Sequence, residues 1–133
     1  MSVQLNRMSL DLGIVSADGA AALAFYCDTL GLALAAEISV PGGAVKKIKC
    51  GDSFIKIFVP DQPPAHLVQR GGLAAATGYR YCTLSIRNVD AVVQKCREAG
   101  YRIAVDVREL RPGVKVALIE DPDGNTVELM QEA

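Results

Sequence analysis

One pattern occurs twice in this chain, with an offset of about 70 residues, and this repeat constrains the fold more than any other feature. The first copy opens with LDLGIVSADGAAALAFYCDTLGL, and the second opens with YRYCTLSIRNVDAVVQKCREAGY. In each copy an alternating strand pattern leads to a residue that can cap a helix, Asp18 in the first and Asn88 in the second. Three further strand patterns follow each helix. The sequence therefore predicts two βαβββ modules.

The spacing of apolar residues places the elements within each module. The first helix should run from Asp18 to about Leu30, and the second should begin after Asn88 and end at Gly100. The buried stripe of the first helix is expected to consist of Leu23, Tyr26, Cys27 and Leu30. Strands are expected near residues 9–15, 32–40, 44–50, 53–59, 102–108, 113–120 and 125–131.

The repeat also predicts how the modules are organised. We expect residues 1–133 to form one domain, with module one at about 8–60, a connector at 61–78 and module two at about 79–131. Two βαβββ units bury their sheet edges best by pairing with each other. The predicted architecture is an α+β fold in which the two modules form one curved, partly open barrel, with a cavity lined by alternate strand residues.

Composition and charge exclude several classes of function. The formal net charge is −1, with 14 basic and 15 acidic residues, so nothing favours binding to nucleic acid or an anionic membrane. The densest basic stretch, Lys46, Lys47 and Lys49, is expected to be the solvated face of a strand. Four cysteines without a CxxC pair indicate reduced packing residues. No stretch is typical of a signal peptide or membrane span, so we expect a cytoplasmic protein.

Three motifs occur in the order and spacing that a known family has, and they give the sequence a resemblance to that family. They are Asp18 followed by AFYCDTLGL, then NVDAVVQKCREAG from Asn88, and EDPDGNTVELMQ from Glu120. From about Leu10 to Gln131 the chain resembles the vicinal oxygen chelate superfamily, which includes glyoxalase I, bleomycin- and fosfomycin-resistance proteins and extradiol dioxygenases. The resemblance implies a cup-shaped site for a small molecule and a homodimer.

Members of that superfamily typically chelate a divalent metal with a histidine on the first strand of each module and a glutamate on the last. The matching positions here hold Asp11, Lys56, Tyr81 and Glu128, and only Glu128 keeps the family residue. An ammonium group cannot ligate a cation and repels it, so we predict neither a bound metal nor another cofactor. A weakly held ion between Asp11 and Glu128 is the less favoured alternative. The only histidine, His66, has no partner at ligand spacing.

The same four positions predict an acid–base site. Glu128 or Asp11 could act as a general base while Lys56, together with the Tyr81 hydroxyl, stabilises a developing oxyanion. In the alternative interpretation, Lys56 only neutralises the two carboxylates in an internal ion-pair network and takes no part in chemistry.

The remaining positions on the concave face indicate the kind of ligand. A mainly apolar lining with hydroxyl groups suits a small, partly hydrophobic carbonyl or aromatic compound, although side chains could also simply fill a small barrel. Three functions remain open: a metal-independent lyase or isomerase, a non-catalytic binding or sequestration protein, and a metal-dependent lactoylglutathione lyase or dioxygenase. The missing histidines disfavour the third. The predicted lining residues are Phe54, Phe58, Tyr79, Thr83 and Met130.

Overall fold

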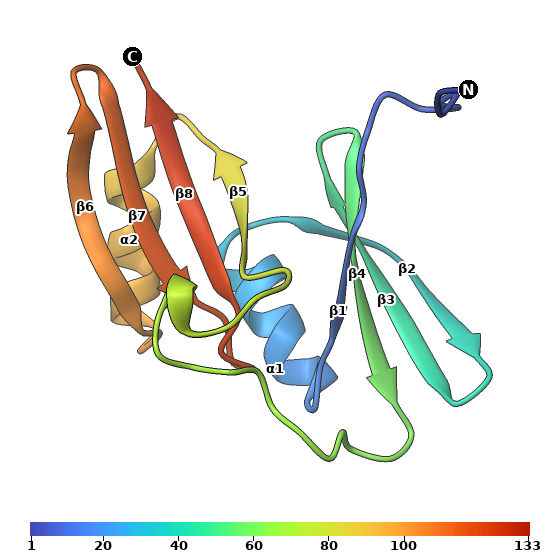
Figure 1. Ribbon diagram of the computed structural model, residues 1–133. Helices are drawn as coiled ribbons and strands as arrows, with labels where there is room; N and C mark the ends of the chain where they lie inside the picture. Colours follow the sequence, from blue (N-terminus) through green and yellow to red (C-terminus); the bar gives the residue numbers. More distant parts are fainter.

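The structure, a computed structural model, describes all 133 residues and contains two modules with the same order of elements (Figure 1). A connector between them includes a short 3₁₀ helix, η2 (Leu73–Ala75). The first module comprises β1 (Leu12–Val15), α1 (Gly19–Leu23), η1 (Ala24–Thr29), β2 (Ala33–Val40), β3 (Gly43–Cys50) and β4 (Ser53–Pro60). The second comprises β5 (Tyr81–Ser85), α2 (Val89–Glu98), β6 (Ile103–Arg111), β7 (Val114–Glu120) and β8 (Thr126–Glu132).

Each module forms one four-stranded sheet, and the two sheets have equivalent strand orders. These are β1-β4-β3-β2 and β5-β8-β7-β6. In both, the first strand of the module runs parallel to the last, and the other neighbours are antiparallel. The predicted α+β fold of two βαβββ modules is confirmed. Each expected strand is present, although β1 begins at Leu12 rather than residue 9 and β6 continues to Arg111.

The two sheets diverge like the sides of an open V, with α1 at its base (Figure 1). No strand pairs across from one sheet to the other, so the barrel is open, as the sequence predicts. The free edges of β1 and β5 lie on either side of the opening. The helices of the structure are too short to cross a lipid bilayer.

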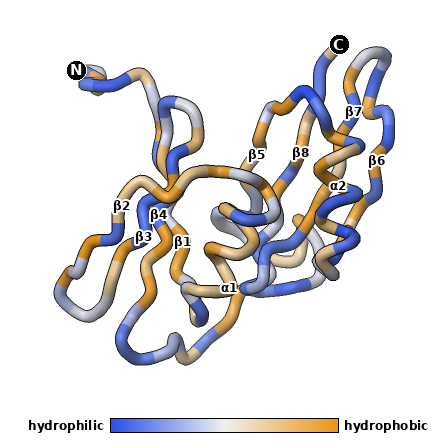
Figure 2. Tube along the Cα trace, turned by 180° about the vertical axis from the view of Figure 1, so that it is seen from behind, coloured by the Kyte–Doolittle hydropathy of each residue, from blue (hydrophilic) through white to orange (hydrophobic).

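The core is continuous across both modules. Alternation along the strands sends Ile55 and Ile57 of β4, and Val127 and Leu129 of β8, toward the helices, where they are at most 4% exposed. In α2, hydrophobic and hydrophilic residues alternate along the tube (Figure 2), and its hydrophobic side packs into the same cluster. The opposite face of each sheet is therefore free to line a site.

The first helix differs from the prediction in its second half. Residues 24–29 form a π-helix, in which the Leu30 N–H donates to the Phe25 carbonyl oxygen at 2.9 Å. This wider turn places Phe25 as well as Tyr26 in the core, each 0% exposed. The predicted stripe included Tyr26 but missed Phe25, because it assumed the regular α-helical period.

Only one of the two predicted caps is confirmed. The Asp18 carboxylate accepts from the Ala21 N–H at 3.1 Å. Asn88 makes no side-chain cap, and the Val89 N–H donates instead to Gln131 Oε1 at 2.8 Å. The prediction for Asn88 was wrong because a side chain from β8, distant in sequence, supplies the acceptor.

The turn between β7 and β8 joins the two modules through hydrogen bonds. Tyr26 in η1 donates its hydroxyl to Asp121 Oδ2 at 2.7 Å, and the buried Ser16 donates to Asp123 Oδ2 at 2.6 Å. Burial, and then the Asp121 carboxylate, raise the pKa of Tyr26 well above its ordinary value, so its hydroxyl keeps the proton that it donates. Burial also raises the pKa of Asp121. These contacts set the position of one sheet relative to the other.

Replacing Tyr26 with Phe should lower the free energy of unfolding by about 1.5–3 kcal/mol, because a buried carboxylate loses one of its donors. Urea denaturation of the wild type and Tyr26→Phe measures this difference. Tyr101→Phe is the matched control, since Tyr101 packs on the Phe25 ring and its hydroxyl makes no hydrogen bond. Equal losses in the two variants would contradict a stabilising role for the Tyr26–Asp121 bond.

Candidate functional site

A cleft of about 580 Å³ lies between the edges of β1 and β5. This volume is within the range of small-molecule sites in proteins. The residues that line it come from the segment 10–13, the β3–β4 turn region, and residues 79–84, and they are mainly apolar. Both modules therefore contribute to one cleft, as expected for a cup built from two sheets.

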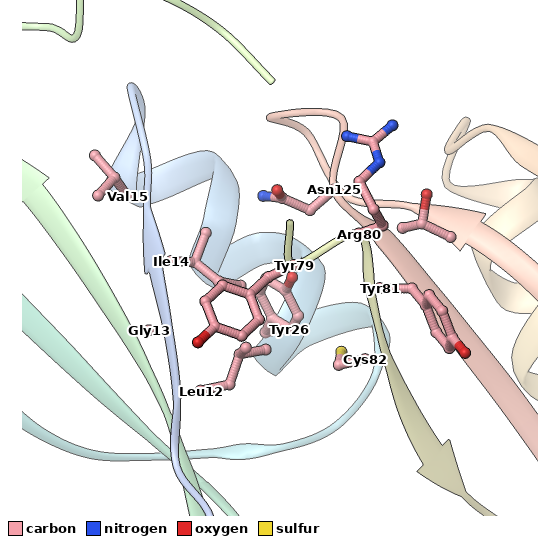
Figure 3. A pocket seen from close by; sticks show the side chains of 11 residues that line it. Leu12, Gly13, Ile14, Val15, Tyr26, Tyr79, Arg80, Tyr81, Cys82 and Asn125 are labelled. Carbon is pink, nitrogen blue, oxygen red and sulfur yellow. The ribbon is translucent and has the colours of Figure 1, made fainter. Parts of the chain in front are cut away.

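A smaller space of about 160 Å³ continues the cleft toward η1. Figure 3 shows its walls: Leu12 and Ile14 project from β1, and Tyr79 lies between β1 and the start of β5. Tyr26, held by Asp121, contributes the side of this space nearest the helix. Leu12 and Tyr79 also line the larger cleft, so the two spaces share walls.

The structure brings some predicted site residues to this cleft and not others. Every second residue of a strand faces the same way, so Lys56 and Phe58 share the face of Phe54 on β4. On β8, Glu128 and Met130 share the face of Thr126 in the same way. These four residues lie on the concave faces but do not line the cleft. The predicted residues that do line it are Asp11, Phe54, Tyr79, Tyr81 and Thr83.

Asp11 is the most extensively paired of these residues. Its Oδ1 accepts from the Phe54 N–H at 2.9 Å, and its Oδ2 lies 2.9 Å from Arg7 Nη2 and 3.4 Å from Lys56 Nζ. The Phe54 N–H, with help from Arg7 and Lys56, holds the pKa of Asp11 below its usual value. An ionised carboxylate with these donors anchors cations better than it accepts a proton from a substrate.

Arg7 is a site residue that the sequence analysis missed. It also donates to the Asp52 carbonyl oxygen at 3.1 Å, so it fixes the N-terminal segment against the β3–β4 turn. No periodic or motif signal surrounds Arg7 in the sequence, and its role depends on a contact made only in the folded chain.

Glu128 and Lys56 occupy equivalent places in the two modules. Lys56 lies opposite Gly13 in the first sheet, and Glu128 lies opposite Thr83 in the second. Glu128 Oε1 accepts from the Thr83 hydroxyl at 2.7 Å, and Glu128 forms no ion pair. The predicted network linking Lys56 to both carboxylates is therefore not formed within this chain, because Lys56 pairs with Asp11 alone.

These residues do not fit a divalent metal. The Lys56 ammonium lies among the positions that would hold the ion, and the oxygens of Asp11 are occupied by donors. No group of three or more His, Cys, Asp or Glu side chains gathers at a spacing suited to a metal.

Two cysteines, Cys50 and Cys82, also line the cleft. Burial is the main factor that raises both thiol pKa values, that of Cys82 to about 11. Thiols with raised pKa values remain protonated at neutral pH and are poor nucleophiles. Their contribution to the cleft is therefore apolar surface.

Comparison with known proteins identifies the family. Residues 6–129 match the family described as the Glyoxalase/Bleomycin resistance protein/Dioxygenase superfamily. A protein of Synechocystis sp. named "Probable lactoylglutathione lyase" is 26% identical over 118 residues, which are 82% of this chain and 83% of that protein.

Solved structures share the fold. A glyoxalase family protein from Bacillus cereus has a TM-score of 0.82 at 20% identity, covering 98% of this chain and 96% of its own. The trypanothione-dependent glyoxalase I of Leishmania major has a TM-score of 0.74 at 20% identity, covering 96% of this chain and 88% of its own. With the match over residues 6–129, this chain belongs to the glyoxalase/bleomycin resistance protein/dioxygenase superfamily.

Proposed function

We propose that the chain binds a small, partly apolar carbonyl or aromatic compound in the cleft between β1 and β5. The observation that carries this proposal is the cleft itself, about 580 Å³ in volume and mainly apolar, with the polar groups of Asp11, Tyr81 and Thr83 in its lining. A few polar groups in an apolar cleft can orient a small ligand while its body is buried.

Within this proposal, the chain acts on the ligand as a metal-independent lyase or isomerase. Glu128 removes a proton from a carbon next to a carbonyl group, and Lys56 stabilises the negative charge that develops on the carbonyl oxygen. Glu128 accepts from Thr83 at 2.7 Å and has no cationic partner, and Lys56 lies 3.4 Å from Asp11, so each is adjacent to a residue that lines the cleft. Asp11, ionised and paired, positions the Lys56 ammonium.

A second candidate is a binding protein without catalysis. It is favoured by the position of Lys56 and Glu128, which lie on the concave faces beside the cleft rather than in its lining. In this case Lys56 would contribute to affinity and not to a chemical step.

A metal-dependent lactoylglutathione lyase or dioxygenase activity is disfavoured. The donor set contains an ammonium and no imidazole, and it does not fit a divalent ion. We derive no step that uses a metal.

Binding in the cleft is tested by filling it. A Cβ added at Gly13 would meet no atom within 4 Å, so the first carbon of the Gly13→Leu side chain fits without a clash, and the side chain should extend into the cleft that Gly13 lines. Calorimetric titration with acetophenone should show saturable binding to the wild type and binding about tenfold weaker or more to Gly13→Leu. Ser39→Leu, an exposed change on β2 outside the cleft, is the matched control. Unchanged affinity in Gly13→Leu would exclude this cleft.

A further inference from the structure

We infer that the compound bound in the cleft carries an anionic group, a carboxylate or a phosphate, which the cationic side of the cup holds. This inference rests on the proposed function and narrows its ligand class. It rests on four cationic side chains near Phe54, of which only Lys56 stands at one of the family's metal-ligand positions. The four cations are Arg7, Lys47, Lys49 and Lys56.

Three of these cations surround the ring of Phe54, which lines the cleft. Lys47 Nζ lies 4.2 Å from the ring centroid, Lys49 Nζ 5.4 Å, and Arg7 Cζ 5.7 Å. The face of an aromatic ring attracts a cation but does not neutralise its charge. The ring therefore holds the positive groups beside the cleft and leaves them able to meet an anion.

Strand register places the lysines on the same face as Phe54. Lys49 lies opposite Phe54, and Lys47 lies opposite Lys56 on the neighbouring strand. Like charges directly opposite each other on a sheet repel and destabilise the pair. Relief of this repulsion by a bound anion would add to its affinity.

The anionic groups of the protein do not balance this cluster. Asp11 pairs with Arg7 and Lys56, whereas Lys47 and Lys49 form no ion pair. Asp52, in the adjacent turn, forms no ion pair with any of the four cations. The chain as a whole has a net charge of −1, so this excess is local rather than a consequence of a basic composition.

The neighbouring Lys46 shows that the basic stretch is divided between the two faces of the sheet. Lys46 pairs with Glu37 at 2.8 Å, and its side chain lies against Gly19 at the start of α1. The expectation that Lys46, Lys47 and Lys49 form one solvated face was therefore wrong, because strand alternation turns Lys46 toward the helix side. Of these three lysines, the two that form no ion pair, Lys47 and Lys49, both lie on the cup side of the sheet.

The opposite wall of the cup has a different character. Tyr81 and Thr83 line the cleft from β5, and Glu128 lies beside Thr83. An anionic group is therefore expected to be oriented toward β3 and β4 of the first module, with the apolar body of the ligand directed into the cleft. Carboxylates and phosphates share the chemistry that lysine and arginine recognise.

The test compares near-isosteric probes that differ in charge. Titrations with benzoate, phenyl phosphate and the neutral acetophenone are made at low ionic strength and repeated in added salt, which weakens exposed charge interactions. We expect at least one anion to bind about tenfold more tightly than acetophenone or better, with an advantage that falls as salt is added. The anion that binds more tightly identifies the preferred group.

The combined variant Lys47→Gln and Lys49→Gln should lose that advantage while acetophenone affinity stays the same. Lys115→Gln is the control, since Lys115 lies on the second module and pairs with Asp90. Equal affinity for anions and acetophenone, or an anion advantage that survives the combined variant, overturns the inference and keeps the proposed cleft. If no probe binds in the cleft, the proposed function fails as well.

Discussion

Replacing Phe25 with Ala should lower the free energy of unfolding by about 3–5 kcal/mol, the usual cost of removing a buried ring. Phe25 is 0% exposed, and its ring packs edge-on against Tyr26 and Tyr101, with centroid separations of 4.8 and 4.9 Å. Because Tyr101 belongs to the second module, the substitution removes packing within the first module and between the modules together.

Urea denaturation followed by circular dichroism measures this loss. Leu67→Ala is the control, because Leu67 is 75% exposed in the connector and its truncation should change stability by no more than about 0.5 kcal/mol. A loss below about 1 kcal/mol for Phe25→Ala would show that the core at this junction is not packed as described.

The sequence predicts the modules well because their patterns are local and occur twice. Alternation along 53–59 separates Phe54, Lys56 and Phe58 from Ile55 and Ile57, and the structure places the two isoleucines in the core. Only one assignment of faces puts the apolar residues of a half-buried strand in the core, so the sequence alone shows which residues point inward.

What the sequence does not reveal depends on contacts between distant residues. Gln131 caps α2 from strand β8, and the π-helix at residues 24–29 buries Phe25 beside Tyr26. Neither has a local signature, because regular periodicity and capping preferences describe isolated helices.

The site was predictable in part for the same reason. Strand parity places Asp11 and Lys56 on one face, and their ion pair at 3.4 Å is consistent with that placement. The charge around Phe54 was not predictable, since Arg7 and Lys47 reach the ring from different segments. The distance between the two sheets also depends on the Asp121 and Asp123 contacts, so convergence of all four polar positions could not be deduced from parity.

Replacing Lys56 with Met should reduce kcat about 10²- to 10³-fold, the usual effect of removing a single oxyanion-stabilising group. Phenylpyruvate is a suitable probe because it combines a carbonyl, an aromatic body and a carboxylate. Glu128 would take a proton from the carbon between the ring and the carbonyl, and Lys56 would stabilise the enolate oxygen until it is protonated to the enol. Ultraviolet absorbance follows this tautomerisation in either direction.

Lys115→Met separates this effect from a general effect of losing a surface lysine. Lys115 is 49% exposed and pairs with one aspartate at 3.0 Å, whereas Lys56 is 46% exposed and pairs with one aspartate at 3.4 Å. Wild type and Lys115→Met should therefore have equal rates, and Glu128→Gln should be as slow as Lys56→Met, since base and electrophile act in the same step. Normal turnover in Lys56→Met would contradict the proposed role of its ammonium. Tight binding of phenylpyruvate without acceleration by the wild type would instead favour the non-catalytic binding protein, because affinity alone lowers no barrier.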